Sequence, residues 1–300
     1  MVLTNGPTLR FVMQPDLVFT ANYVANPFLG TRGVYNGLFY ASDPLQRLHD
    51  RSGAFNLTVT GLGGYSGTAI LAGKRTNSVS GKFDLNGFAT NRVVLNPSNS
   101  YTVEWQLALT PGVDQITGRL SNGVWEVPLA GVRAWFNGTN NKATNYNGKY
   151  TMAVHAGPLS DPFTAPQGDG YATGNIDLAG NFSVAGMLAD NTPFALKKPL
   201  AKDGSWPLYV SLYSGKGSIF GWVTNYADTS VDLMNDLAGD LFWIRPLITN
   251  AVYHREGFMD TFVLGGSRYQ PPQPPARPTN SVLPATEYYV YYTGDRRAHV

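Results

Sequence analysis

The sequence predicts an all-β protein made of two tandem copies of an antiparallel β-barrel or sandwich module. Turn-forming residues are abundant, with 33 Gly and 20 Pro among 300 residues, and a long internal segment repeats without gaps. Only 14% of the residues are charged, against about 25% in an ordinary soluble domain. Short strands joined by glycine-rich turns are typical of β-sandwiches and barrels, so we expect hydroxyl and amide side chains to supply much of the polar surface.

An internal repeat sets the predicted domain organisation. Residues 53–87 align with residues 170–204 at a constant offset of 117, and both segments end in a turn of the type Asx-Gly. An ungapped match with equivalent turns indicates a duplicated structural unit. We therefore expect two copies, at residues 33–138 and 144–247, related by a pseudo-twofold axis.

The repeat weakens on both sides of this segment. Upstream, Tyr35-Asn36-Gly37 aligns with Tyr146-Asn147-Gly148 at an offset of 111, which predicts an insertion near residues 157–166. Downstream, residues 111–118 still resemble residues 214–221, which places Gly118 on Gly221, and residues 123–125 resemble residues 239–241. These flanking matches are short, and they extend the copies to the boundaries given above.

Within each copy the local patterns predict strands. Residues 55–60 (Phe-Asn-Leu-Thr-Val-Thr) alternate strictly between apolar and polar side chains, as in a strand with one buried face. Further strands are expected at residues 68–71, 78–83, 103–109, 115–120 and 125–129. Asn-Gly, Asp-Gly and Gly-Gly steps separate the strands, as in antiparallel hairpins. The best helical pattern covers only residues 229–237.

The segments outside the two copies are expected to be short extensions. Residues 1–30 contain alternating stretches on both sides of Gln14-Pro15-Asp16, which predicts a hairpin. This segment resembles the closing hairpin of the InlB-type B-repeat of bacterial surface proteins, and we expect the chain to begin inside a longer secreted protein. Residues 248–300 form a C-terminal extension with a stiff Pro-rich spacer at 271–278 and a final strand at 287–292.

The repeated region also resembles a known group of proteins. The motifs that carry the resemblance are YNGLFY, SGAFNLTVTGLGGYSGTAILAGK, DQITGRLSNGVWEVPL, GDGYATGNIDLAGNFSVAGMLADNTPF and KDGSWPLYVSLYSGKGSIFGW. With these motifs, residues 33–265 resemble uncharacterised β-rich repeat modules of large secreted or surface proteins of environmental bacteria. The resemblance implies an extracellular or cell-surface setting among neighbouring modules, and it implies no activity.

Composition excludes several classes of function. The formal net charge of +2 gives no electrostatic footprint for nucleic acid. The chain has no cysteine, which excludes disulfides, thiolate zinc sites and a cysteine nucleophile. No apolar run approaches the roughly 18–20 residues that span a bilayer. We therefore expect neither a nucleic-acid partner nor a membrane span.

Histidines and carboxylates flank the two copies. His49-Asp50 precedes the repeated segment of copy one, whereas His254, Glu256 and Asp260 follow copy two. If a pseudo-twofold axis brought these segments together, the five side chains could ligate Zn²⁺ or Mn²⁺ and activate water. His254, His49 and Glu256 would then be catalytic candidates. The alternative is that all five lie in solvated loops without a common site.

A second candidate cation site comes from spaced aspartates. Asp228, Asp232, Asp236 and Asp240 recur every four residues, which on a helix would place like charges on one face. Calcium favours such oxygen clusters, and Asp232 and Asp236 are the candidate ligands. The alternative is an acidic solvated loop, because the EF-hand pattern is missing. The sequence requires no cofactor; the candidates are divalent Zn, Mn or Ca.

The densest aromatic segment suggests a sugar-binding surface. Between Trp206 and Lys216, the side chains of Tyr209 and Tyr213 share one face of a predicted strand. Aromatic faces can stack on sugar rings, so Trp206, Tyr209, Tyr213 and Lys216 are the candidate ligand-binding residues. The alternative is a strand that is buried on both faces.

Two functions from different classes follow. The first is a non-catalytic extracellular β module that binds carbohydrate or serves as a cell-surface or adhesion scaffold, with a glycan or cell-surface polymer and neighbouring modules as partners. The second is a metal-dependent hydrolase of an ester, phosphoester or glycoside, with its site at the junction of the two copies. The small number of titratable groups, with 22 basic, 20 acidic and 4 His residues, favours the first.

Overall fold

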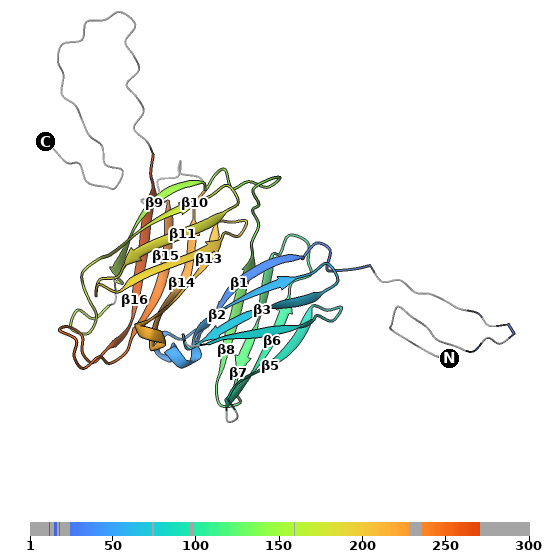
Figure 1. The fold of residues 1–300 in the computed structure, drawn as a ribbon, viewed down its shortest axis with the longest axis horizontal. Coiled ribbons are helices and arrows are strands. Elements are labelled where there is room, and N and C mark those ends of the chain that lie inside the picture. Colours follow the sequence, from blue (N-terminus) through green and yellow to red (C-terminus); the bar gives the residue numbers. More distant parts are fainter. Residues whose placement is uncertain are drawn as a thin grey trace, which may run out of the picture.

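The fold is nearly all β, and it is seen in a computed structural model (Figure 1). The structure describes residues 12, 15, 16, 18, 25–73, 75–96, 99–158, 160–227 and 236–270. These residues form two eight-stranded antiparallel sheets in tandem, with three short 3-10 turns. The predicted all-β class and the two tandem barrel copies are confirmed, whereas the predicted pseudo-twofold relation is not, because the barrels contact each other through non-equivalent faces. Most of the predicted N-terminal hairpin lies outside the described residues, as does most of the helix predicted at residues 229–237. The Pro-rich spacer and the final strand also lie outside them.

Barrel one is a meander whose first and last strands also pair. Its strands are β1 Gly33–Phe39, β2 Gly53–Val59, β3 Gly64–Leu71, β4 Arg75–Lys82, β5 Phe88–Asn96, β6 Asn99–Leu107, β7 Gln115–Ser121 and β8 Glu126–Arg133. The sheet order is β4-β3-β2-β1-β8-β7-β6-β5, so β4 and β5 are its two edges. The barrel is therefore nearly closed, with one seam between two strands that are adjacent in sequence.

Barrel two repeats this plan. Its strands are β9 Gly148–Ala156, β10 Gly170–Ile176, β11 Asn181–Met187, β12 Pro193–Pro199, β13 Ser205–Leu212, β14 Gly217–Asn225, β15 Leu237–Arg245 and β16 Phe258–Arg268. The order is β12-β11-β10-β9-β16-β15-β14-β13, which puts the seam between β12 and β13. The second sheet thus extends past residue 247, because β16 pairs with both β15 and β9. Among the described residues, no helix is long and apolar enough to cross a bilayer.

Strand pairing corrects the upstream register of the repeat. Gly33 pairs with Val59 in barrel one, and Gly148 pairs with Ile176 in barrel two, which gives β1 and β9 an offset of 115. The offset of 111 was wrong, because it rested on a chance recurrence of Tyr-Asn-Gly before β9. With the correct offset Tyr35 corresponds to Tyr150. Each of these buried phenols donates a 2.7 Å hydrogen bond to the carbonyl four residues earlier in the chain.

The downstream register is also corrected. Gly118 lies opposite Trp105 in barrel one, and Gly239 lies opposite Val223 in barrel two. The counterpart of Gly118 is therefore Gly239 and not Gly221. Both glycines are needed, since a Cβ there would lie 1.9 Å and 2.6 Å from a backbone carbonyl oxygen of the neighbouring strand.

Each barrel is filled by inward-facing apolar side chains around a buried tryptophan. Trp105 of β6 donates its indole N–H to Asn91 of β5 at 2.9 Å, and Trp206 of β13 donates to Asn225 of β14 at 2.9 Å. Since β5 and β13 are equivalent strands, the Trp and the Asn have exchanged strands between the copies. In both barrels, therefore, an asparagine of an adjacent strand accepts the hydrogen bond of the buried indole N–H.

The barrels pack against each other through non-equivalent outer faces. An apolar cluster joins Leu38 and Ala54 of barrel one to four residues of β13, β14 and β15, namely Tyr209, Phe220, Phe242 and Ile244. The counterparts of β13–β15 in barrel one are β5–β7, so the two contacting surfaces are not equivalent. Arg47 lies in the loop between β1 and β2. Its guanidinium carbon Cζ is 5.4 Å from the centre of the Phe242 ring, which extends the contact.

Candidate functional site

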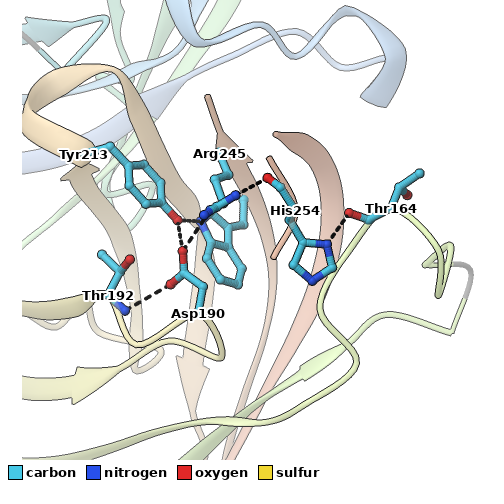
Figure 2. A network of polar contacts seen from close by, with 7 residues as sticks. Thr164, Asp190, Thr192, Tyr213, Arg245 and His254 are labelled. Carbon is cyan, nitrogen blue, oxygen red and sulfur yellow. Dashed lines mark hydrogen bonds and ion pairs between the residues drawn. The ribbon is translucent and has the colours of Figure 1, made fainter. Parts of the chain in front are cut away.

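A polar network closes one end of barrel two. It joins the β11–β12 turn, the 3-10 turn η3 (Tyr213–Gly215), the end of β15 and the β15–β16 loop (Figure 2). We call these connected residues the Asp190 network. Its members are Thr164, Asp190, Thr192, Tyr213, Trp243, Arg245 and His254.

Asp190 lies at the centre of the network. One carboxylate oxygen, Oδ2, accepts hydrogen bonds from the phenol of Tyr213 at 2.6 Å and from Nε of Arg245 at 3.1 Å. The other oxygen, Oδ1, accepts from the backbone N–H of Thr192 at 3.0 Å. Because Tyr213 follows β13 and Asp190 precedes β12, these bonds fasten the open end of the seam in barrel two.

The network continues into the loops beyond the barrel. Arg245 also donates to the backbone carbonyl of His254. The Nδ1 atom of His254 lies 2.9 Å from the carbonyl oxygen of Thr164. Since a carbonyl can only accept, this nitrogen carries the proton. The loop that holds His254 is thereby tied both to β15 and to the loop after β9.

Burial controls the electrostatics of the network. The side chains of Asp190 and Arg245 are each only 8% exposed, so their ion pair is largely desolvated. Burial raises the pKa of the Tyr213 phenol, and the hydrogen bond and negative charge of Asp190 raise it further. The phenol therefore stays protonated at neutral pH and acts as a hydrogen-bond donor.

The backbone around the network is constrained. Asn191, Tyr213, Ser214 and His254 have φ angles of 64°, 53°, 57° and 49°, in the left-handed region that non-glycine residues rarely adopt. Such conformations cost on the order of 1 kcal/mol or more each and persist where the surroundings fix them. Tyr213 and His254 are members of the network, and its hydrogen bonds hold these two residues in place.

A pocket of about 490 Å³ lies beside the network. Its lining includes Asn191, Arg245, Tyr253 and His254. Tyr253 is 77% exposed and presents an aromatic face to solvent. The pocket therefore combines fixed polar groups with one exposed ring, which suits a small polar ligand.

The predicted sugar-binding residues separate into two pairs. Tyr213 belongs to the Asp190 network, and together with Lys216 it lines an adjoining pocket of about 410 Å³. Trp206 is fully buried in the core of barrel two. Tyr209 is 7% exposed at the contact between the barrels, where its hydroxyl accepts from the N–H of Gly73 at 3.0 Å. The rings of Trp206 and Tyr209 are therefore not accessible to a ligand, because their strand is buried on both faces.

The histidines and carboxylates proposed for a metal are held by other partners. His49 lies at the contact between the barrels, with Nδ1 3.0 Å from Ser218 Oγ and Nε2 3.1 Å from the carbonyl oxygen of Gly215. Asp260 accepts from Ser160 Oγ at 2.6 Å. His254 is held in the Asp190 network.

The remaining carboxylates of that proposal lie near the surface. Asp50 is 68% exposed beside Arg51, and Glu256 is exposed in the β15–β16 loop. In the part of the chain that the structure describes, no group of three or more His, Cys, Asp or Glu side chains is placed to hold a metal ion. The hydrolase hypothesis stays a prediction, and the described residues bring together no site for it.

Of the four spaced aspartates, Asp236 and Asp240 lie within the described residues. Asp236 accepts a 2.6 Å hydrogen bond from the backbone N–H of Arg268, which joins the start of β15 to the end of β16. Asp240 is exposed on β15. Asp228 and Asp232 lie outside the described residues, so calcium binding at Asp232 and Asp236 stays a prediction.

Sequence reasoning did not find Asp190 and Arg245. They are 55 residues apart and share no motif. Two local signals point to them: Asp190-Asn191 lies in a hairpin turn, and Arg245 ends the apolar run Leu241-Phe242-Trp243-Ile244. A charged residue at the end of such a buried strand needs a partner, and an aspartate in a turn can supply one.

Comparisons with known proteins find likeness only at the level of structure. No family model and no curated protein matches the chain. A putative outer membrane protein from Bacteroides fragilis has 7% identity and a TM-score of 0.22, with 82% of this chain and all of that chain covered. A protein of unknown function from the DUF3598 family of Nostoc punctiforme has 10% identity and a TM-score of 0.20, with 81% and 98% covered.

A third similar structure belongs to a larger protein. Transferrin Binding Protein B from Haemophilus parasuis has 8% identity and a TM-score of 0.21. The likeness covers 81% of this chain and 60% of that protein.

Proposed function

We propose that this chain is a non-catalytic surface module of a secreted protein, and that barrel two binds the end of a carbohydrate chain. The binding site is the pocket of about 490 Å³ beside the Asp190 network. The observation that carries the proposal is the combination, in one pocket wall, of the exposed ring of Tyr253 with polar groups that hydrogen bonds hold in place.

The pocket has the chemistry that a sugar needs. Sugar hydroxyls both donate and accept hydrogen bonds, and the amide of Asn191 can do both as well. Arg245 and His254 add polar groups whose positions are set before any ligand arrives. Groups fixed in advance lose little conformational entropy on binding, which favours affinity. The face of Tyr253 can pack against the C–H groups of a sugar ring.

The carboxylate and the phenol beside the pocket suit a structural role. Both oxygens of Asp190 accept hydrogen bonds within the network. The raised pKa of Tyr213 keeps its phenol from serving as a base at neutral pH. These observations favour binding over turnover. The low charged fraction of 14% fits an extracellular module that sits among neighbouring modules of a longer chain.

The test is calorimetric titration of the protein with a panel of mono- and oligosaccharides. We expect millimolar to micromolar binding of at least one, and at least a tenfold loss of affinity in Tyr253→Ala. Tyr253 is exposed, so this substitution should leave folding unchanged, and Phe88→Ala, at an exposed aromatic residue of barrel one, is the matched control. Absence of binding across the panel, or equal binding by Tyr253→Ala, would overturn the proposal.

A further inference from the structure

A second feature of barrel two lies on the outer face of its sheet, at β9, β10 and β11. Strand register places the outward side chains of these strands in cross-strand rows. Thr173 lies opposite Thr151 and Ala185, and the next row contains Asn175, Lys149 and Ser183. On the other side, Tyr171 lies opposite Met187 and Ala153.

Because side chains in the middle row are shorter than those in the rows on either side, the rows form a groove. The middle row has only short side chains, at Ala185, Thr173 and Thr151, whereas Tyr171 and Lys149 rise in the rows on either side. Rows on the same face lie two residues apart along the strands, which is about 7 Å. The short row therefore forms the floor, and the longer side chains form the edges.

The groove is open, and hydroxyl and amide groups alternate in it with apolar surface. A hollow of about 690 Å³ lies over it, lined by residues that include Lys149, Thr151, Thr173, Asn175, Ser183 and Tyr269. The backbone N–H of Tyr269 donates to the carbonyl of Lys149 at 2.8 Å, which places this tyrosine at the end of the Lys149 row. The side chains of Tyr269 and Tyr171 are 54% and 61% exposed.

We infer that this groove is a second carbohydrate site, which takes a linear glycan lying across the strands. Threonine and serine hydroxyls and the Asn175 amide can each donate and accept, as the hydroxyls of a sugar chain require. Tyr269 at one edge and Tyr171 at the other present aromatic faces to the C–H side of the rings. Strands lie about 4.8 Å apart, so a groove across several strands accommodates a short run of sugar units rather than one.

The same face of barrel one shows that it can serve as a contact surface. Leu38 and Ala54, which correspond to Ala153 and Tyr171, are 1% and 4% exposed in the apolar contact with barrel two. In barrel two the corresponding face is solvated, and Thr151 and Thr173 are exposed. An aliphatic surface fits a protein partner, whereas hydroxyls beside tyrosines fit a polyhydroxylated one.

The test uses the whole chain and soluble linear polysaccharides, both neutral and uronic-acid types. We expect at least one to slow migration in affinity gel electrophoresis. Thr173→Arg, which fills the groove floor, should weaken that binding at least tenfold, and Tyr269→Ala should weaken it severalfold. Thr58→Arg is the matched control, because Thr58 is an exposed threonine on β2 of barrel one.

The outcomes separate this site from the pocket at the Asp190 network. Loss of polysaccharide binding in Thr173→Arg, with retention in Tyr253→Ala, supports the groove. Loss in Tyr253→Ala alone would overturn the groove and leave the pocket as the only site tested that binds. Failure of the wild-type chain to bind any polysaccharide, or equal binding by Thr173→Arg, would also overturn the groove.

Discussion

Equivalent turns of the two barrels use the same position in opposite ways. In barrel two, the turn after β11 carries Asp190, which binds Tyr213 and Arg245 of its own barrel. At the constant offset of 117, the corresponding residue of barrel one is Gly73. Gly73 binds the other barrel instead: its N–H donates to the Tyr209 hydroxyl, and its carbonyl accepts from Ser211 at 2.9 Å.

The comparison shows how one position determines where a seam finds support. Asp190 fastens the open end of the β12–β13 seam from within. Gly73 lies beside β4, at the seam of barrel one, and its backbone forms hydrogen bonds with Tyr209 and Ser211 of β13 in barrel two. Barrel two should therefore keep its structure by its own contacts, whereas this end of barrel one should depend on the contact between the barrels.

The largest expected effect comes from Asp190→Ala. The substitution leaves Arg245 buried without its carboxylate, and breaking a buried pair in this way costs about 3–5 kcal/mol. Hydrogen exchange followed by mass spectrometry should show faster exchange in β12 and β13, with β6 and β7, which do not pack against β13, unchanged. Asp240→Ala, at an exposed aspartate of β15, is the control. Unchanged exchange in barrel two would contradict the role assigned to Asp190.

A smaller effect is expected from Gly73→Ala. The φ angle of Gly73 is +63°, and an added Cβ would lie 2.6 Å from Ser211 Oγ across the contact. We expect a loss of about 2 kcal/mol of unfolding free energy, from backbone strain and the displaced contact together. Small-angle scattering should show a looser pair of barrels.

Gly112→Ala separates the cost of backbone strain from the cost of the displaced contact between the barrels. Gly112 also has a positive φ, of +86°, but an added Cβ there meets nothing within 4 Å. It should therefore show the backbone cost without the change in shape. Equal scattering curves for Gly73→Ala and wild type would mean that this turn does not hold the barrels together.

The smallest effect concerns Tyr209. Tyr209→Phe removes one hydrogen bond across the contact and should cost about 1 kcal/mol at neutral pH. Burial raises the pKa of Tyr209 to about 12, above the ordinary value of 10.0. A raised folded-state pKa contributes stability that is complete below pH 10 and is lost as the pH rises toward 12. Denaturant unfolding at pH 8, 10 and 11 should thus show a shallower decline for Tyr209→Phe than for wild type.

Tyr35→Phe is the control for this pH dependence. Burial also raises the pKa of Tyr35 to about 12, but its hydroxyl binds Thr31 within barrel one. Both variants should flatten the decline with pH, and only Tyr209→Phe should alter the contact between the barrels. A decline in Tyr209→Phe as steep as in wild type would show that this phenol does not titrate in the expected range.

Much of the fold could be predicted from the sequence because its signals are local. Strict alternation at residues 55–60 matches β2, and the offset of 117 holds for β2 through β5. The register at the flanks could not be predicted, since loop lengths there differ between the copies and a recurring Tyr-Asn-Gly misled the alignment. Strand β16 was missed for the same reason: it corresponds to β8, but the connection before it is longer.

The candidate site was less accessible to sequence reasoning. The aromatic segment at residues 206–216 was found, but alternation alone does not show that the Tyr209 face would be covered by the other barrel. The pairing of Asp190 with Arg245 depends on how the β11–β12 turn meets the end of β15. Such a contact is set by closure of the barrel, and no spacing in the chain encodes it.

The non-equivalence of the two contacting faces gives the pair of barrels a direction. A heterologous interface can in principle repeat from copy to copy and grow into a filament. The positions of Tyr209, Phe220 and Trp222 are occupied in barrel one by Arg92, Thr102 and Glu104, and burying such charges against an apolar face would be costly. The contact between the barrels therefore forms once and does not repeat. The result is a pair of barrels with different outer faces, which can be concentrated at a surface without polymerising through this contact.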